Sequence, residues 1–189
     1  MSVIDETSTD VATVTVRLSI NGGERLLDVD PAETLLTTLR ERLGCLSMRG
    51  TCFIGVCGVC TVLVDGLPIS GCLALTALHE GKTITTAEGL LDANGQPDEV
   101  QAAFIEHSAF QCSFCTPAMV LASTSLLAER PDPTRAEIRE YLAGNLCRCG
   151  SYPNVVDAIR ALARRRREAA RPDGPRPADT GGDTGDTDG

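Results

Sequence analysis

The stretch Cys52-Phe-Ile-Gly-Val-Cys57-Gly-Val-Cys60 holds three of the chain's nine cysteines, and Cys72 follows after eleven intervening residues. Plant-type ferredoxins hold a [2Fe–2S] cluster with this spacing, because a tight loop supplies three thiolates and a neighbouring strand the fourth. Gly55 and Gly58 suit such a loop, since the backbone must approach the cluster closely and donate N–H groups to its sulfurs. A structural zinc site usually takes two C-x2-4-C pairs, so it fits this spacing less well.

A second set of cysteines lies further along the chain. Cys112-x2-Cys115 is followed, after 31 intervening residues, by Cys147-x-Cys149. The spacing alone is compatible with zinc or with a second iron–sulfur cluster. Two such pairs at helix ends would face each other and also offer backbone N–H groups to a thiolate cluster. The ninth cysteine, Cys45, is expected to be a buried free thiol.

Bulk properties exclude several classes of protein. The chain has 189 residues, 42% hydrophobic and 23% charged, and a net charge of −9. Proteins bind nucleic acid largely because their basic residues neutralise phosphates and release counterions. An acidic chain lacks this favourable contribution, so nucleic-acid binding is not expected. No apolar run is long enough for a transmembrane segment, and the acidic N-terminus lacks the features of an export signal. A cytoplasmic location is therefore expected, where thiols bind metal more often than they form disulfides.

The residues around the first cysteine loop predict a small α+β domain over residues 13–90. Alternating apolar residues and turn signals predict two hairpins and one further strand. The strands are expected at residues 14–20, 24–29, 61–64, 67–70 and 82–86. A leucine stripe predicts a helix over residues 35–43, which begins near Thr34 and ends at Gly44.

Residues 91–167 predict a second, all-helical domain beyond a loop at residues 92–97. Four helices are expected. The first covers about residues 98–108, and the second has Thr116 as N-cap and Pro117 as its first residue. The third opens with a capping box at Thr134, and the fourth follows Pro153. Residues 1–12 and 168–189 are polar and are expected to be disordered.

Three stretches resemble one known family. They are Gly55-Val-Cys-Gly-Val-Cys-Thr-Val-Leu-Val-Asp-Gly66, Gln111-Cys-Ser-Phe-Cys-Thr-Pro117 and Gly144-Asn-Leu-Cys-Arg-Cys149. Together they resemble the small iron–sulfur subunit of the xanthine dehydrogenase, aldehyde oxidase and carbon monoxide dehydrogenase family, the molybdenum hydroxylases. The resemblance covers about residues 13–165. It implies a β-grasp, [2Fe–2S] ferredoxin-like domain followed by a four-helix domain, each with one [2Fe–2S] cluster.

The resemblance also implies a role for individual residues. The cluster nearer a flavin would be held by Cys52, Cys57, Cys60 and Cys72. The cluster nearer molybdenum would be held by Cys112, Cys115, Cys147 and Cys149. Gln111 matches a glutamine that contacts the molybdopterin, although from the sequence alone it would more simply close a turn. This chain departs from the family by having Ser113 and Ala118 at glycine positions and Gly150-Ser151 in place of Thr-Gly; none of these changes removes a ligand.

By this resemblance the chain is the electron-transfer subunit of a heterotrimeric oxidoreductase. Electrons would pass from a large subunit with molybdopterin, of the cytosine dinucleotide type, to FAD in a medium subunit. No catalytic residue is expected in this chain, and the substrate would be chosen by the large subunit. The alternative is a free-standing [2Fe–2S] ferredoxin or a zinc-stabilised adaptor.

Overall fold

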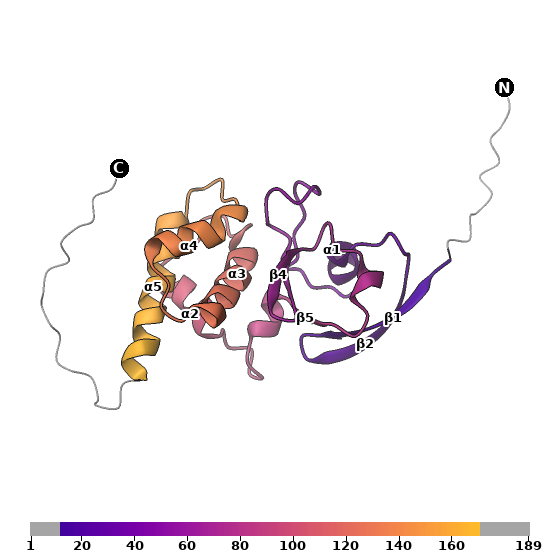
Figure 1. The fold of residues 1–189 in the computed structure, drawn as a ribbon, viewed down its shortest axis with the longest axis horizontal. Coiled ribbons are helices and arrows are strands. Elements are labelled where there is room, and N and C mark those ends of the chain that lie inside the picture. The colour runs from indigo at the N-terminus through magenta and orange to yellow at the C-terminus, as the bar shows by residue number, and fades with distance from the viewer. Residues whose placement is uncertain (1–11, 171–189) are drawn as a thin grey trace, which may run out of the picture.

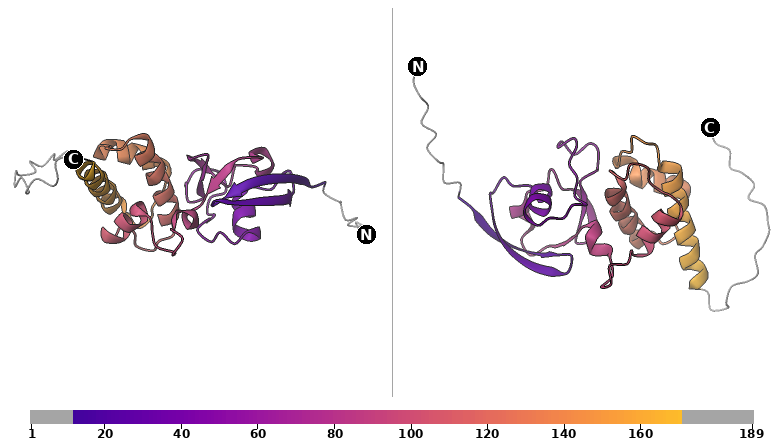
Figure 2. Two further views of the ribbon diagram at one scale, coloured as in Figure 1. Left: turned by 90° about the horizontal axis from the view of Figure 1, so that it is seen from below. Right: turned by 180° about the vertical axis from the view of Figure 1, so that it is seen from behind.

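The computed structural model describes residues 12–170, in which a mixed sheet and a group of helices lie side by side (Figure 1). Two further views show the same separation along the long axis of the molecule (Figure 2). The expected α+β class is therefore confirmed, while the finer two-domain description remains a prediction. The segments expected to be disordered lie outside the described residues, except for residue 12 and residues 168–170. None of the helices described has the length and apolar character needed to cross a bilayer.

The sheet has five strands, which form two hairpins and one further strand between them. They are β1 (Val14–Ile20), β2 (Gly23–Val29), β3 (Thr61–Val64), β4 (Leu67–Ser70) and β5 (Thr83–Thr85), in the spatial order β2-β1-β5-β3-β4. β5 joins the hairpins, since it runs parallel to β1 and antiparallel to β3. The alternation in β1 directs Val16, Leu18 and Ile20 into the core. Every strand lies within one residue of the bounds that the sequence predicts.

The first helix differs in type from the prediction. α1 (Leu35–Thr37) begins as expected, with the Thr34 side chain accepting the Thr37 N–H. It then continues as a π-helix, η1 (Thr38–Arg42), in which the Leu43 N–H donates to the Thr38 carbonyl. Gly44 follows with φ +69°, as a helix stop requires. Hydrophobic periodicity detected the buried leucines but did not distinguish a π-helix from an α-helix.

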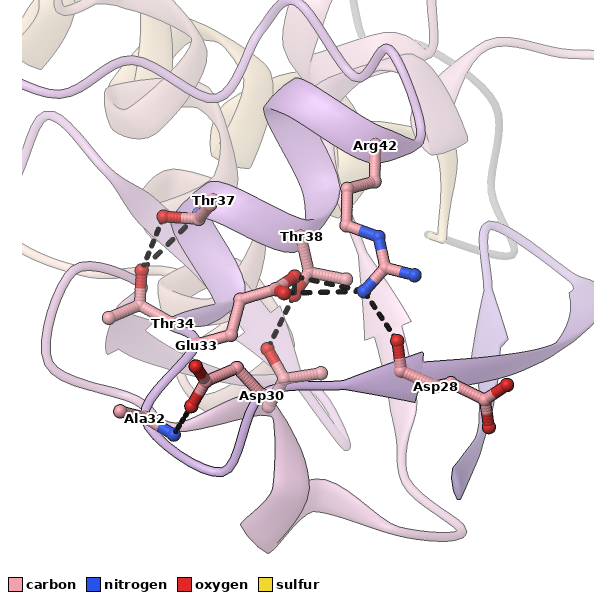
Figure 3. A network of polar contacts seen from close by, with 9 residues as sticks. Asp28, Asp30, Ala32, Glu33, Thr34, Thr37, Thr38 and Arg42 are labelled. Atoms are coloured by element: carbon pink, nitrogen blue, oxygen red, sulfur yellow. Dashed lines mark hydrogen bonds and ion pairs between the residues drawn. The ribbon is translucent and has the colours of Figure 1, made fainter. Parts of the chain in front are cut away.

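Polar contacts fix this helix against its neighbours (Figure 3). The Glu33 carboxylate accepts a hydrogen bond from the Thr38 hydroxyl and pairs with Arg42 at 3.2 Å. Arg42 also donates to the Asp28 carbonyl at 2.8 Å, which ties η1 to β2. The Thr38 and Thr76 hydroxyls are 2.7 Å apart, which ties η1 to the 3-10 helix η2 (Thr76–His79). The loop that carries the first cysteines thus leaves from an anchored helix.

The remaining chain forms four longer helices. They are α2 (Glu99–Glu106), α3 (Thr116–Glu129), α4 (Arg135–Tyr141) and α5 (Tyr152–Ala169). The capping box at Thr134 is confirmed. The prediction that Thr116 is an N-cap is wrong by one residue, because Cys115 takes that position and Thr116 begins the helix. Pro153 likewise lies inside the first turn of α5, which ends two residues beyond the expected limit of 167.

The sheet and the helices share a buried contact. Leu63 of β3, Leu121 of α3 and Ala87 of the 3-10 helix η3 (Ala87–Leu90) pack together. Val59, two residues before β3, is buried within the helical core. The Ser125 hydroxyl of α3 adds a hydrogen bond to a β-hairpin carbonyl at 2.9 Å. The cysteine loops of the two parts are therefore held at a packed interface.

The capping box of α4 provides a test of the fold. Thr134→Ala removes the hydroxyl that accepts the Glu137 N–H, at a cost of about 1 kcal/mol. We expect the thermal unfolding midpoint to fall by about 2–4 °C. Arg139→Ala, on the same exposed helix, is the control and should change it less. Equal midpoints for the Thr134 variant and the unchanged protein would show that the box contributes nothing.

Candidate metal centres

The first four candidate ligands converge at one end of the β3–β4 hairpin. Cys60 directly precedes β3 and Cys72 follows β4, so the antiparallel pairing brings them together. The Gly71 N–H donates to the Cys60 carbonyl at 3.1 Å, and the Cys72 thiol is close enough to raise the pKa of Cys60. The loop before β3 supplies Cys52 and Cys57, and the Cys57 thiol is close enough to lower the pKa of Cys52. The four thiols thus lie close together.

Backbone N–H groups surround the exposed end of this quartet. Phe53, Gly55 and Gly58 have φ values of +55°, +74° and +63°, which turn successive N–H groups of the loop toward one side. The N–H groups of Ile54 and Cys57 are the main reason why the pKa of the Cys52 thiol is lowered to about 6. Burial acts in the opposite direction at Cys60, whose pKa is raised to about 11.

The second quartet is built on helix ends. Cys112 and Cys115 stand at the start of α3, while Cys147 and Cys149 lie between the 3-10 helix η4 (Leu142–Gly144) and α5. The Cys149 thiol is close enough to lower the pKa of Cys112, and the Cys147 thiol is close enough to raise that of Cys115. The four helix-end cysteines therefore come together, as in the first quartet.

The members of the second quartet differ in their exposure to solvent. Cys112 and Cys149 are exposed, and Cys115 is buried. Burial raises the pKa of Cys115 to about 12. Burial also raises the pKa of Cys147, but the N–H and hydroxyl of Ser151 outweigh it and lower the value to about 7. The Cys147 sulfur and Ser151 hydroxyl are 3.6 Å apart, so Ser151 adds a polar contact to a candidate ligand.

The number of thiols in each quartet bears on which metal group fits. A [2Fe–2S] cluster takes four thiolate ligands, and each quartet contains four cysteines. Across residues 12–170, no group of three or more His, Cys, Asp or Glu side chains is arranged to hold a metal ion. All nine cysteines are free thiols in the structure.

Two further residues singled out by the sequence have distinct positions. Cys45 lies in the core of the sheet, where burial raises its pKa, and is buried as expected. Gln111 is exposed and directly precedes Cys112, so its side chain is available to a partner. The expected role of Gln111 remains a prediction.

The sequence did not point to Arg49. Its guanidinium donates to the Ser113 carbonyl and lies 5.3 Å from the centre of the Phe114 ring. It therefore joins the chain just before Cys52 to the loop between Cys112 and Cys115. No local motif signals such a contact, because the two partners are 64 residues apart.

Comparisons with known proteins agree with this geometry. A family model described as "[2Fe-2S] binding domain" matches residues 86–160. The chain is 42% identical over 164 residues to the aldehyde oxidoreductase iron-sulfur-binding subunit PaoA of Escherichia coli (strain K12), covering 77% of this chain and 70% of that protein. It is 40% identical over 152 residues to the nicotinate dehydrogenase small FeS subunit of Eubacterium barkeri, covering 80% and 96%.

A solved structure extends the similarity to three dimensions. A chain of quinoline 2-oxidoreductase from Pseudomonas putida 86 superposes with a TM-score of 0.78 and 41% sequence identity. The match covers 82% of this chain and 97% of that chain, so it includes both the sheet and the helices.

The ligand sets can be tested by iron analysis. Cys57→Ser removes one member of the first quartet and should lower the iron content from about four to about two per chain. Cys45→Ser is the control, because Cys45 lies in the sheet core and belongs to neither quartet. Loss of two irons from the Cys45 variant, or none from the Cys57 variant, would contradict the assignment.

Ser113 offers a test of the second loop. It has φ +61°, a conformation that favours glycine and that a β-branched residue rarely adopts. Ser113→Gly should keep all iron and raise the unfolding midpoint, whereas Ser113→Val should lose the iron of the second quartet. Ser108→Val is the matched control, with φ +48° outside both quartets, and should lower stability without loss of iron. Full iron in the Ser113→Val variant would show that this backbone geometry is not needed.

Proposed function

Because this chain belongs to the iron–sulfur subunits of the molybdenum hydroxylases, we propose that it passes electrons from a molybdopterin centre in a large subunit to FAD in a medium subunit. The first [2Fe–2S] cluster would be bound by Cys52, Cys57, Cys60 and Cys72. The second would be bound by Cys112, Cys115, Cys147 and Cys149. A bound [2Fe–2S] cluster accepts and gives up one electron at a time, so two of them would transfer electrons singly.

One observation carries this proposal: the loops that bear the two cysteine quartets contact each other. The Leu146 N–H, next to Cys147, donates to the carbonyl of Cys57 at 2.9 Å. A zinc-stabilised adaptor would have no need for two sites in direct contact. The contact supports a relay within this chain.

Exposed apolar side chains support docking to partners. Phe53, Ile54 and Val56 of the first loop are each more than 60% exposed, and Phe110 and Phe114 are exposed beside the second. Exposed apolar groups that gather in this way usually mark an interaction surface. We assign the first surface to the flavin subunit and the second to the molybdopterin subunit, in a heterotrimer of the cytoplasm. The two-domain division near residue 90 belongs to the same proposal.

The substrate lies beyond this chain. The names of three similar proteins refer to different compounds: aldehyde, nicotinate and quinoline. All three proteins are nevertheless similar in sequence to this chain. Substrate choice by the large subunit accounts for this range. The chain's own residues position thiolates, donate N–H groups to them and form contacts with the partners.

Purification of the natural complex tests the proposal. Two larger subunits should co-purify with this chain, one with molybdopterin and one with FAD, and substrate should bleach the visible absorption of the iron–sulfur chain. A chain that purifies alone with iron would be a free-standing ferredoxin. A chain that purifies with zinc would be an adaptor. Either result would overturn the proposal.

Gln111 can be tested within the complex. Its amide both donates and accepts, so it is suited to the polar edge of a pterin. Gln111→Ala should leave the iron content unchanged and slow reduction of the chain by substrate, but not by dithionite. Gln96→Ala, an exposed glutamine in the loop at residues 92–97, is the matched control. A wild-type rate of reduction by substrate would leave Gln111 with a structural role only.

A further inference from the structure

Asn145 lies where the two cysteine loops meet. It follows η4 and precedes Cys147 by two residues, and its side chain is only 7% exposed. A buried amide must find hydrogen-bond partners, because an unsatisfied polar group in the interior costs about 1–3 kcal/mol. The partners of the Asn145 side-chain amide are Gly58 of the first loop and Thr61 at the start of β3, 87 and 84 residues earlier in the chain.

The side-chain amide of Asn145 joins the two loops through hydrogen bonds. Its Nδ2 donates to the Gly58 carbonyl at 2.8 Å and to the Thr61 hydroxyl at 3.0 Å. The Thr61 hydroxyl in turn donates to the same Gly58 carbonyl at 2.6 Å. One buried side chain from the second loop thus bonds to Gly58, inside the Cys57–Cys60 segment, and to Thr61, directly after it. This segment carries two candidate ligands.

The backbones approach as closely as they can at the same point. A Cβ atom on Gly58 would lie 2.2 Å from the Gly144 carbonyl oxygen and 2.8 Å from Asn145 Nδ2. Gly58 also has φ +63°, so both space and conformation require glycine. The hydrogen bond from the Leu146 N–H to the Cys57 carbonyl lies beside this contact. Because Gly58 has no side chain, the two backbones touch directly, and this contact fixes the distance between the loops.

We propose that Asn145 is a positioning residue that sets the separation, and hence the electronic coupling, between the two metal centres. It holds no iron itself and contacts no substrate. The inference rests on the proposed function, since it requires a cluster in each quartet. In this proposal the Asn145 amide and the missing side chain of Gly58 preserve the hydrogen bond from the Leu146 N–H, next to Cys147, to the Cys57 carbonyl.

The test is paramagnetic resonance of the fully reduced complex. Two half-integer spins held close together split each other's signals, so the natural protein should show spin–spin splitting. Asn145→Asp has the same size but replaces the amide donor by an oxygen that repels the Gly58 carbonyl. It should keep its iron and lose or shrink the splitting. Asn154→Asp is the matched control, because the Asn154 amide also donates to two carbonyls, those of His107 and Ser108, neither of which belongs to the first cysteine loop.

A second pair of variants separates contact from strain. Gly58→Ala adds a methyl group that must push the loops apart, so it should also reduce the splitting. Gly22→Ala, with φ +79° and open space around it, carries similar backbone strain and should leave the splitting unchanged. If the Gly58→Ala variant fails to bind iron, the splitting measured in the Asn145→Asp variant alone decides whether the inference holds.

The outcomes are distinct. Full iron with unchanged splitting in Asn145→Asp would overturn the inference, as would natural protein with full iron and no splitting. Loss of iron from Asn145→Asp would make the residue structural and would also overturn it. Natural protein with fewer than about four irons would instead contradict the proposed function.

Discussion

The rest of the structure depends on holding eight cysteine sulfurs in two small groups. As metal ligands they would be thiolates, and like charges at close range repel unless other groups compensate. The first loop compensates with inward N–H groups, which its positive φ values at Phe53, Gly55 and Gly58 make possible. The second places its sulfurs at the starts of α3 and α5, where unpaired helical N–H groups favour negative charge. Two unrelated scaffolds thus supply the same kind of electrostatic support.

The scaffolds also give the two sites different surroundings. One is set against the edge of a sheet hairpin, with Cys60 and Cys72 buried, while the other leaves Cys112 and Cys149 exposed. Cluster potential follows exposure and hydrogen bonds to sulfur, so the sites are expected to differ in potential. The Ser151 hydroxyl lies 3.6 Å from the Cys147 sulfur and could donate such a hydrogen bond to a Cys147 thiolate.

Much of this molecule was predictable from the sequence, because the decisive signals are local. Alternation, apolar β-branched runs and turn signals predicted the strands to within one residue, and the cysteine spacings grouped the thiols that the structure brings together. Two details of the helices were not predicted. Thr38–Arg42 forms a π-helix, and Cys115 takes the N-cap position expected for Thr116. The contacts of Arg49 and Asn145 join segments more than 60 residues apart, which no local pattern can reveal.

The central claim is that the two cysteine quartets hold two different [2Fe–2S] clusters. The most direct measurement is paramagnetic resonance of the dithionite-reduced complex, recorded at several temperatures alongside iron and sulfide analysis. The account predicts two distinguishable signals of equal intensity, with about four irons and four sulfides per chain. A single signal with half that iron would contradict it.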